Sequence, residues 1–476
     1  MTGTMMPDGA AWGGPPRMSP AEALMWRAEG DLRTRSSGLV IEILESAPDW
    51  QRFIAAHGQA VQAIPRLRDK VVQPLLPVVE PTWTEDTHFD LGYHVQRVQL
   101  PEPGSERQLL DLAAQITSRP LEPNRPQWEV TLVEGLEGGR AAYLLKIHHA
   151  MTDGLGIVQL LGMAHSDTAE PGGNHLPTSA VAAAAAPVVN PLSLLTDRLV
   201  EEVTHAPGRL VGAAGDALGL LGRTLRDPAG SAERAVRYGL SLRRMLNPPA
   251  AERSPLLRGG GFGYQLVVLD VQLDELKAAG KAAGGSVNDA FLACILGAFR
   301  RYHEHFGQPI EYLPMAIPIS LRDSNDPMGG NRFTGARFVA PIGEADPRTR
   351  IRLIREFILN VRAEPAIGFL DLISPVLSKL PQLLLTELTA ELTKVTDVQA
   401  SNIPGVGKPV YLAGSKVLRM YPIGPRPGVA AMVAMVSYAG TCCIGFNVDP
   451  EAITDVKLFE ECLRDGFDEV LELGRS

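Results

Sequence analysis

Two stretches in which strand-like and helix-like patterns alternate constrain the fold more than any other feature of the chain. The first runs from Leu39 to Met163 and the second from Tyr264 to Tyr438. The chain has 476 residues, which exceeds the size at which one hydrophobic core stops growing. We therefore expect an α/β protein of two large domains, with room for a deep cleft between them.

The segment between the two stretches differs in composition from both. It is rich in Pro and Gly, contains the run Ala182–Ala186, and carries short amphipathic patterns such as Leu195–Val203. The start of the chain is also rich in Gly and Pro. The sequence thus predicts four parts, namely a disordered tail at 1–17, an N-terminal domain at 18–165, a helical crossover linker at 166–257 and a C-terminal domain at 258–476.

The expected strands are short runs with alternating or continuous apolar residues. They are Leu39–Ile43, Tyr93–Leu100, Trp128–Val133, Tyr143–Ile147, Tyr264–Val271, Tyr312–Ile319, Phe338–Pro341 and Val429–Tyr438. The glycines of Gly135–Gly139 predict a turn that makes the third and fourth strands a hairpin. Ser286 with Asp289 resembles a capping box at a helix start, and the apolar stretch Phe369–Leu392 predicts another helix.

Composition excludes several classes of protein. Lys and Arg total 45 against 54 for Asp and Glu, and the net charge of −9 predicts no nucleic-acid partner. The four cysteines form no C-x-x-C pair, which argues against a structural metal or a disulfide framework. The N-terminus does not have the pattern of a signal peptide, and no uncharged apolar run reaches the roughly 18 to 20 residues that cross a bilayer. We expect a cytoplasmic protein that can lie on a membrane.

The segment richest in chemistry reads His148-His149-Ala150-Met151-Thr152-Asp153-Gly154, hereafter the histidine motif. It follows an expected strand, and a helix-like pattern begins at Leu155, so its polar groups stand where a strand meets a helix. Imidazole has a pKa near neutrality and can take a proton from an alcohol as the oxygen attacks an acyl carbon. His149 is therefore the candidate general base.

Two other residues of the histidine motif have expected roles. The carboxylate of Asp153 can anchor the loop through an Arg or through backbone N–H groups, and Gly154 permits a left-handed backbone or a close backbone approach. Asp153 is interpreted as an organiser of the loop rather than as a proton acceptor. A purely structural histidine pair stays open as an alternative, and so does a zinc site with the nearby His165.

Other candidate sites are weaker. No Gly-x-Ser-x-Gly segment offers a serine nucleophile, and the pair Cys442-Cys443 is expected to begin a buried strand rather than to supply a thiolate. Gly259–Gly263 lacks the strand and helix of a dinucleotide loop, so no nucleotide cofactor is expected. The cluster Arg234, Arg237, Arg243 and Arg244 could touch phospholipid or coenzyme A phosphates, or form a solvated helix face.

Further segments, together with the histidine motif, resemble one known family. They are Met18-Ser19-Pro20, Phe89-Asp90-Leu91, Tyr93-His94-Val95, Arg125-Pro126-Gln127-Trp128-Glu129, Gly285-Ser286-Val287-Asn288-Asp289, Pro318-Ile319-Ser320-Leu321-Arg322, Gly330-Asn331-Arg332 and Ser401-Asn402-Ile403-Pro404-Gly405. From Met18 to near Phe467 the chain is similar to the bacterial wax ester synthase/acyl-CoA:diacylglycerol acyltransferases. That family belongs to the coenzyme A-dependent acyltransferase superfamily, with condensation domains and chloramphenicol acetyltransferase.

The resemblance implies two pseudo-symmetric, chloramphenicol-acetyltransferase-like α/β domains, each a mixed β-sheet with flanking helices. It places the second histidine in a tunnel between them, with acyl-CoA at one mouth and the hydroxyl acceptor at the other. By this resemblance His149 is the base, His148 supports its placement and Asp153 is structural. The candidate substrate or oxyanion contacts are Asn288, Asp289 and Gly154. Asn288 is assigned as an oxyanion donor, with capping of helix backbone donors as the alternative.

The activity implied is transfer of a long-chain acyl group from acyl-CoA, a substrate rather than a cofactor, to diacylglycerol or a long-chain alcohol by direct attack. The alternatives are a condensation-type acyltransferase that uses a carrier-protein thioester and a non-catalytic lipid-binding homologue. Two segments depart from the family pattern. Gln127 replaces the usual Leu, and 33–38 lacks the usual Met-His-Val-Gly. The segments Leu195–Val203, Arg234–Leu246 and Phe369–Leu392 predict peripheral contact with a membrane or lipid droplet.

Overall fold

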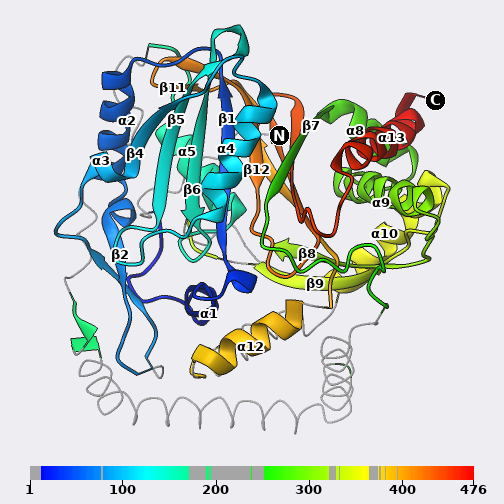
Figure 1. Cartoon of the computed structure of the whole chain (residues 1–476), viewed down its shortest axis with the longest axis horizontal. Coiled ribbons are helices and arrows are strands. Elements are labelled where there is room, and N and C mark those ends of the chain that lie inside the picture. Colours follow the sequence, from blue (N-terminus) through cyan, green and yellow to red (C-terminus); the bar gives the residue numbers. More distant parts are fainter. Residues whose placement is uncertain are drawn as a thin grey trace, which may run out of the picture.

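The computed structural model describes residues 12–76, 79–170, 189–191, 193–194, 237, 251–320, 328–331, 333–363, 374, 377–380, 382–393 and 395–475. Two six-stranded sheets with flanking helices form two halves that lie side by side (Figure 1). Each sheet contains both parallel and antiparallel pairs. The predicted α/β fold with mixed sheets is therefore confirmed.

The first sheet has the order β11-β12-β1-β6-β5-β4. Its strands are β1 (Ser37–Leu44), β4 (Val95–Gln99), β5 (Trp128–Leu136), β6 (Arg140–His148), β11 (Tyr411–Leu412) and β12 (Ser415–Ile423). A small separate sheet pairs β2 (Asp69–Val72) with β3 (Thr82–Glu85). Strands β5 and β6 pair antiparallel across a turn in which Gly135, Gly138 and Gly139 have positive φ, as the expected hairpin requires.

The second sheet has the order β7-β14-β13-β10-β8-β9. Its strands are β7 (Gln265–Gln272), β8 (Leu313–Ser320), β9 (Phe333–Ala340), β10 (Val398–Val406), β13 (Ala431–Tyr438) and β14 (Thr441–Val448). Cys442 and Cys443 lie near the start of β14, which is buried throughout, as the sequence predicts.

Helices cover both sheets. Those of the first half are α1 (Pro20–Ala28), α2 (Trp50–Ala63), α3 (Leu91–His94), α4 (Glu106–Ser118) and α5 (Gly154–Ala164), with short 3-10 turns η1 (Leu32–Thr34), η2 (Pro65–Arg68) and η3 (Glu137–Gly139). Those of the second half are α8 (Leu273–Ala282), α9 (Val287–His305), α10 (Pro347–Arg362), α12 (Gln382–Thr393) and α13 (Val456–Arg475). The expected capping box at α9 is present, with Ser286 and Asp289 bonding reciprocally.

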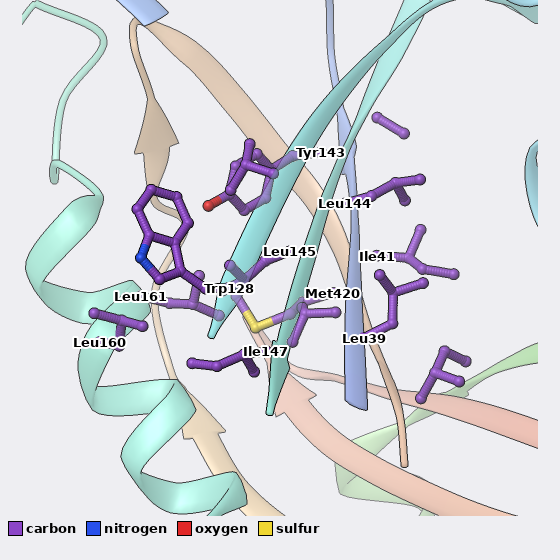
Figure 2. Close-up of a cluster of buried hydrophobic side chains, with 14 of the residues drawn as sticks. Leu39, Ile41, Trp128, Tyr143, Leu144, Leu145, Ile147, Leu160, Leu161 and Met420 are labelled. Atoms are coloured by element: carbon purple, nitrogen blue, oxygen red, sulfur yellow. The ribbon is translucent and has the colours of Figure 1, made fainter. Parts of the chain in front are cut away.

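The core of the first half explains why β6 ends at a fixed place. Side chains alternate along a strand, so Tyr143, Leu145 and Ile147 face the helix α5, where Leu160 and Leu161 meet them (Figure 2). The opposite face of β6 carries Leu144, Lys146 and His148. Both faces are buried, so a slip of one residue would put Lys146 and His148 among the apolar side chains. The hydrophobic pattern thus fixes the position of both histidines.

The two sheets do not divide the chain into two continuous segments. Strands β11 and β12 come from the predicted C-terminal domain, yet β12 pairs with β1 of the first sheet. The halves meet closely here because Gly445 of β14 has no side chain. A Cβ at that position would lie 2.2 Å from the Pro422 carbonyl oxygen of β12. The predicted domain boundaries at 165 and 258 rest on composition, whereas strand pairing decides which strands belong to each sheet.

Three expected segments need correction. The tail predicted at 1–17 is ordered from Trp12 onward, because Trp12 is buried and its neighbours form backbone hydrogen bonds. The strand expected from Tyr93 begins at Val95, because Asp90 caps the short helix α3 by accepting from the Gly92 N–H. The strand expected at Phe338–Pro341 begins at Phe333.

The segments predicted to contact lipid are only partly described. Leu195–Val203 and all of Arg234–Leu246 except Arg237 lie outside the described residues, and of Phe369–Leu392 the structure shows helix α12. Within the described part of the chain, no single helix is long and apolar enough to cross a membrane. The pair α8 and α9, bent by 92°, passes that test together by length and composition.

Candidate active site

The histidine motif lies at the junction of β6 and α5. Strand β6 ends at His148, and α5 begins at Gly154 with Asp153 as its N-cap. The end of the strand is held by β1, where Ser37 pairs with His148. The intervening loop is therefore fixed at both ends by regular structure, which keeps its side chains in defined positions.

His149 has its main chain held from both halves. Its N–H donates to the Ser36 carbonyl over 2.9 Å, and its own carbonyl accepts from Asn331 Nδ2 over 2.7 Å. The ring is partly exposed. The surrounding protein removes enough water to lower the pKa of His149, while the carboxylate of Asp153 and a hydrogen bond with the Asn331 side chain oppose that shift. The ring is therefore neutral at neutral pH, which is the form that a general base needs.

His148 is fully buried and has a defined tautomer. The Ala150 N–H donates to His148 Nδ1 over 2.9 Å, so the single hydrogen of the neutral ring lies on Nε2. That nitrogen is 3.1 Å from Oε2 of Glu29, and the Trp26 ring packs edge-on against the imidazole at 5.5 Å. These contacts fix the His148 ring, and its expected support of His149 stays a prediction.

Glu29 connects the two histidines. Its Oε2, the oxygen close to His148, also accepts the Ser36 N–H over 2.6 Å. The carbonyl of Ser36 in turn accepts the His149 N–H. One carboxylate oxygen thus lies beside the ring of the first histidine and binds the peptide that fixes the second. Glu29 follows α1 with no local motif around it, and sequence reasoning did not identify it.

Asp153 and Gly154 organise the start of α5. Asp153 Oδ1 accepts the Gly156 N–H over 2.9 Å, which satisfies one of the unpaired donors at the helix N-terminus. This agrees with its expected structural role. Gly154 is not in the left-handed region. A Cβ there would lie 2.6 Å from Ile403 Cδ1 of β10, so close approach between the halves is what the glycine permits.

The second half reaches the histidine motif through the loop 328–331. Asp153 donates its N–H to the Gly330 carbonyl over 3.1 Å, and Thr152 forms an isolated bridge with Gly330. The contact from Asn331 to His149 comes from the same loop. Asn331 belongs to one of the segments that carry the family resemblance, yet its contact with the motif was not predicted from sequence.

Asn288 and Asp289 lie at the start of α9. Asp289 Oδ2 accepts from both the N–H and the Oγ of Ser286, each over 2.8 Å, and Arg355 of α10 is 3.6 Å away. These contacts give Asp289 a capping role. The second-half contacts with the motif described above come from the loop 328–331 and from β10, and the expected oxyanion role of Asn288 stays a prediction.

The alternative chemistries find little support. Among the described residues no cluster of three His, Cys, Asp or Glu side chains could hold a metal ion. His165 caps the far end of α5, about 16 Å from the motif at 1.5 Å per residue, and it pairs there with Glu42. Burial raises the pKa of the Cys442 thiol to about 11 and that of Cys443 to about 12, so neither is a thiolate at neutral pH.

Comparison with known proteins finds relatives that match both halves of the chain. Residues 18–291 match the family model described as wax ester synthase/diacylglycerol acyltransferase catalytic domain, and residues 329–471 match the corresponding C-terminal domain. A putative diacylglycerol O-acyltransferase of Mycobacterium tuberculosis is 42% identical over 466 residues, which cover 96% of this chain and 93% of the relative. A second one from that species is 27% identical over 91% of each chain.

Solved structures show the same fold. The wax ester synthase/diacylglycerol acyltransferase from Marinobacter aquaeolei VT8 has a TM-score of 0.62 at 20% identity, and the match covers 96% of this chain and 100% of that one. The first condensation domain of the calcium-dependent antibiotic synthetase has a TM-score of 0.61 at 15% identity, with 96% of both chains covered. The similarity of fold therefore extends over both halves.

Proposed function

This chain belongs to the wax ester synthase/diacylglycerol acyltransferase family, and we propose that it transfers a long-chain fatty acyl group from acyl-CoA to a lipid hydroxyl. The acceptor is diacylglycerol or a long-chain alcohol. The observation that carries the proposal is the neutral His149, held between the two halves by Ser36 and Asn331. A base placed there meets substrates that enter from either half.

The proposed reaction is a direct displacement. His149 removes the proton of the acceptor hydroxyl as its oxygen forms a bond to the thioester carbon. The carbon–sulfur bond then breaks, and the proton on the imidazole passes to the coenzyme A sulfur. Neutral imidazole both accepts and returns one proton, so the enzyme ends each cycle unchanged. General-base assistance contributes about 10²- to 10⁴-fold, and orientation of the two substrates supplies a large part of the remainder.

Glu29 and His148 act on this base indirectly in the proposal. His148 Nε2 lies 3.1 Å from Glu29 Oε2, and the same carboxylate oxygen accepts the Ser36 N–H of the peptide whose carbonyl accepts the His149 N–H. The main chain of His149 is therefore fixed before substrate binds. A base that is already aligned costs no reordering during the reaction, which is the usual function of such supporting contacts.

Donor preference follows from the apolar tunnel that the family resemblance predicts. Burial of an acyl chain contributes roughly 0.8 kcal/mol per methylene as an upper bound. Over about ten methylenes this exceeds the about 0.5–1.5 kcal/mol net effect of a single hydrogen bond. Long-chain acyl-CoA should therefore be favoured over acetyl-CoA. The proposal needs acyl-CoA only as a substrate and no cofactor.

The decisive experiment offers purified protein palmitoyl-CoA with a panel of diacylglycerols, long-chain alcohols and short alcohols, and identifies the products by mass. We expect triacylglycerol or wax ester, with free coenzyme A in equal amount. Product formed only from an acylated carrier protein would instead identify a condensation-type acyltransferase. Binding of palmitoyl-CoA with no transfer to any acceptor would identify a non-catalytic lipid-binding homologue.

Peripheral contact with a membrane or lipid droplet is proposed for the same enzyme. Helix α12 lies next to α1 (Figure 1), tied to the first half by an ion pair of 2.7 Å between Glu387 and Arg33. Its Leu384 is 60% exposed and Leu388, one turn away, is 39% exposed. Flotation with phosphatidylglycerol vesicles tests this contact. Binding that survives high salt indicates apolar insertion, and an absence of binding contradicts it.

A further inference from the structure

The segment Trp12–Arg17, hereafter the N-terminal strap, lies against the first turn of α5. It precedes the part of the chain that matches the catalytic-domain family, which begins at residue 18. Trp12 is 3% exposed, and its Nε1–H donates to the Gly156 carbonyl over 3.0 Å. The next residue, Gly13, donates its N–H to the Met328 carbonyl over 3.1 Å. Two adjacent residues of the N-terminal strap thus bind both sides of the junction between the halves.

Three glycines allow the backbones to meet at this junction. A Cβ on Gly329 would lie 2.7 Å from the Gly13 nitrogen, and a Cβ on Gly156 would lie 1.8 Å from Thr152 Oγ1 and 3.1 Å from the Gly329 Cα. Gly13 and Gly329 also have φ of +108° and +73°, which favour glycine. A side chain at Gly156 or Gly329 would push the N-terminal strap, the loop 328–331 and α5 apart, and one at Gly13 would meet the Arg66 side chain at 2.7 Å.

The rest of the N-terminal strap is anchored to the first half. The Pro16 carbonyl accepts the Trp83 N–H over 2.7 Å, as an extra strand would. Arg66 Nη2 donates to the Gly14 and Pro15 carbonyls over 3.0 and 2.8 Å, while its guanidinium lies over the Trp83 ring. The N-terminal strap is therefore fixed to the first half, and its hydrogen bond with Met328 links it to the second half.

From the loop 328–331 the contacts continue to the proposed base. The Gly329 N–H donates to Gln159 Oε1 of α5 over 3.0 Å, and Gly330 accepts from Asp153. Asn331, the next residue, donates to the His149 carbonyl. The N-terminal strap thus binds the same loop that fixes His149 from the second half. Trp12 also binds α5, which carries the residues just beyond the histidine motif.

We propose that Trp12 is a positioning residue, which through the N-terminal strap fixes the loop 328–331 and the start of α5 around His149. The proposal rests on the proposed role of His149 as base. Its effect should appear in kcat rather than in the KM for acyl-CoA, because the strap orders the base and contacts no proposed donor group. A misplacement of about 1 Å in an active site can lower the rate about 10²-fold.

The test uses the full chain with Trp12→Phe, Trp12→Ala and, as a matched control, Trp50→Phe. Trp50 packs on Phe53 and under Arg97 of the first half, away from the histidine motif. Trp12→Phe removes the indole donor and part of the buried ring and should lower kcat about threefold, and Trp12→Ala should lower it about 10- to 100-fold. Hydrogen exchange at residues 150–156 and 328–331 should accelerate in the same order. Trp50→Phe should change neither quantity.

Two results would overturn the proposal. One is wild-type kcat and wild-type exchange in both Trp12 variants. The other is hydrogen exchange that accelerates equally in β13 and β14, far from the strap, with kcat lowered only in proportion to the fraction of unfolded protein. That result would make Trp12 a residue of general stability. If the wild-type protein transfers palmitate to no acceptor, the proposed function fails. The exchange measurement then still decides whether Trp12 orders the loop and α5.

Discussion

One histidine lies just before helix α5 and another at its C-terminal end, and the two have pKa values shifted in opposite directions. His149, five residues before the helix, has its pKa lowered because its ring is desolvated. His165, the C-cap, is desolvated as well, yet its pKa is raised because Glu42 Oε2 lies 2.8 Å from its Nε2. Desolvation acts in the same direction at both ends, so the nearby carboxylate decides the sign.

The opposite pKa shifts distinguish His149, the proposed base, from His165, a structural histidine. His165 Nδ1 is 2.6 Å from the Leu161 carbonyl, and Nε2 is 2.8 Å from the Glu42 carboxylate, so both ring nitrogens face acceptors and the protonated ring is favoured. A cation at a helix C-terminus is also favourable for the helix dipole. His149 has Asp153 nearby, but that carboxylate caps α5 through Gly156, and the ring stays neutral.

The largest expected effect comes from removing the base itself. His149→Ala should lower the turnover rate by about 10²-fold or more, because general-base assistance is lost, with acyl-CoA affinity nearly unchanged. Steady-state kinetics with palmitoyl-CoA and calorimetric binding measure the two quantities. Retention of more than about a tenth of the wild-type rate would exclude His149 as the base.

At the other end of the helix the expected effect is on stability. His165→Leu or Glu42→Leu alone should lower the free energy of unfolding by about 3–5 kcal/mol, because each leaves a buried charge without its partner. The double variant should recover much of that loss. Since the pKa of His165 is raised on folding, the stabilisation is complete below about pH 6.5 and is lost as the pH rises through the folded-state pKa. Urea unfolding at several pH values tests both points.

The local features around helix α5 were predictable from the sequence. The apolar run before His148 predicted a strand and the pattern after Asp153 predicted a helix, because both depend on residues close in the chain. The capping roles of Asp153 and Ser286 were predictable for the same reason.

The parts that depend on distant pairing were not predicted. Glu42 and His165 are separated by 123 positions, and Asn331 and His149 by 182, so no local pattern connects them. Strand β12 joins the first sheet from the second half because β1 offers an open edge, which composition cannot show. Trp12 is buried within a segment whose Gly and Pro content predicted disorder. In that segment the burial of one large apolar side chain had more influence on the structure than the Gly and Pro content.

Glu29 is a third carboxylate beside a histidine, with its Oε2 3.1 Å from His148 Nε2. Glu29→Ala should lower kcat about 10-fold or more, since the Ser36 N–H loses its acceptor and His148 loses the carboxylate beside its ring. Glu29→Gln should restore the rate to within about threefold, because an amide oxygen can still accept the Ser36 N–H. Glu45→Ala, at an exposed position after β1, is the control. Equal losses in the Gln and Ala variants would show that charge is required.

The smallest effect is expected from Asp153→Asn, which removes one charge beside the base. The carboxylate of Asp153 raises the pKa of His149, so its removal should lower that pKa further. The base then stays unprotonated to lower pH, and the acid limb of the kcat/KM profile should move to lower pH. Asn is as good an N-cap as Asp, so the midpoint of urea unfolding should change little, whereas Asp153→Ala should lose about 1 kcal/mol. An acid limb that does not move would mean that a group other than His149 titrates in the profile. A limb that moves to higher pH would contradict the assignment of Asp153 as the charge that opposes desolvation.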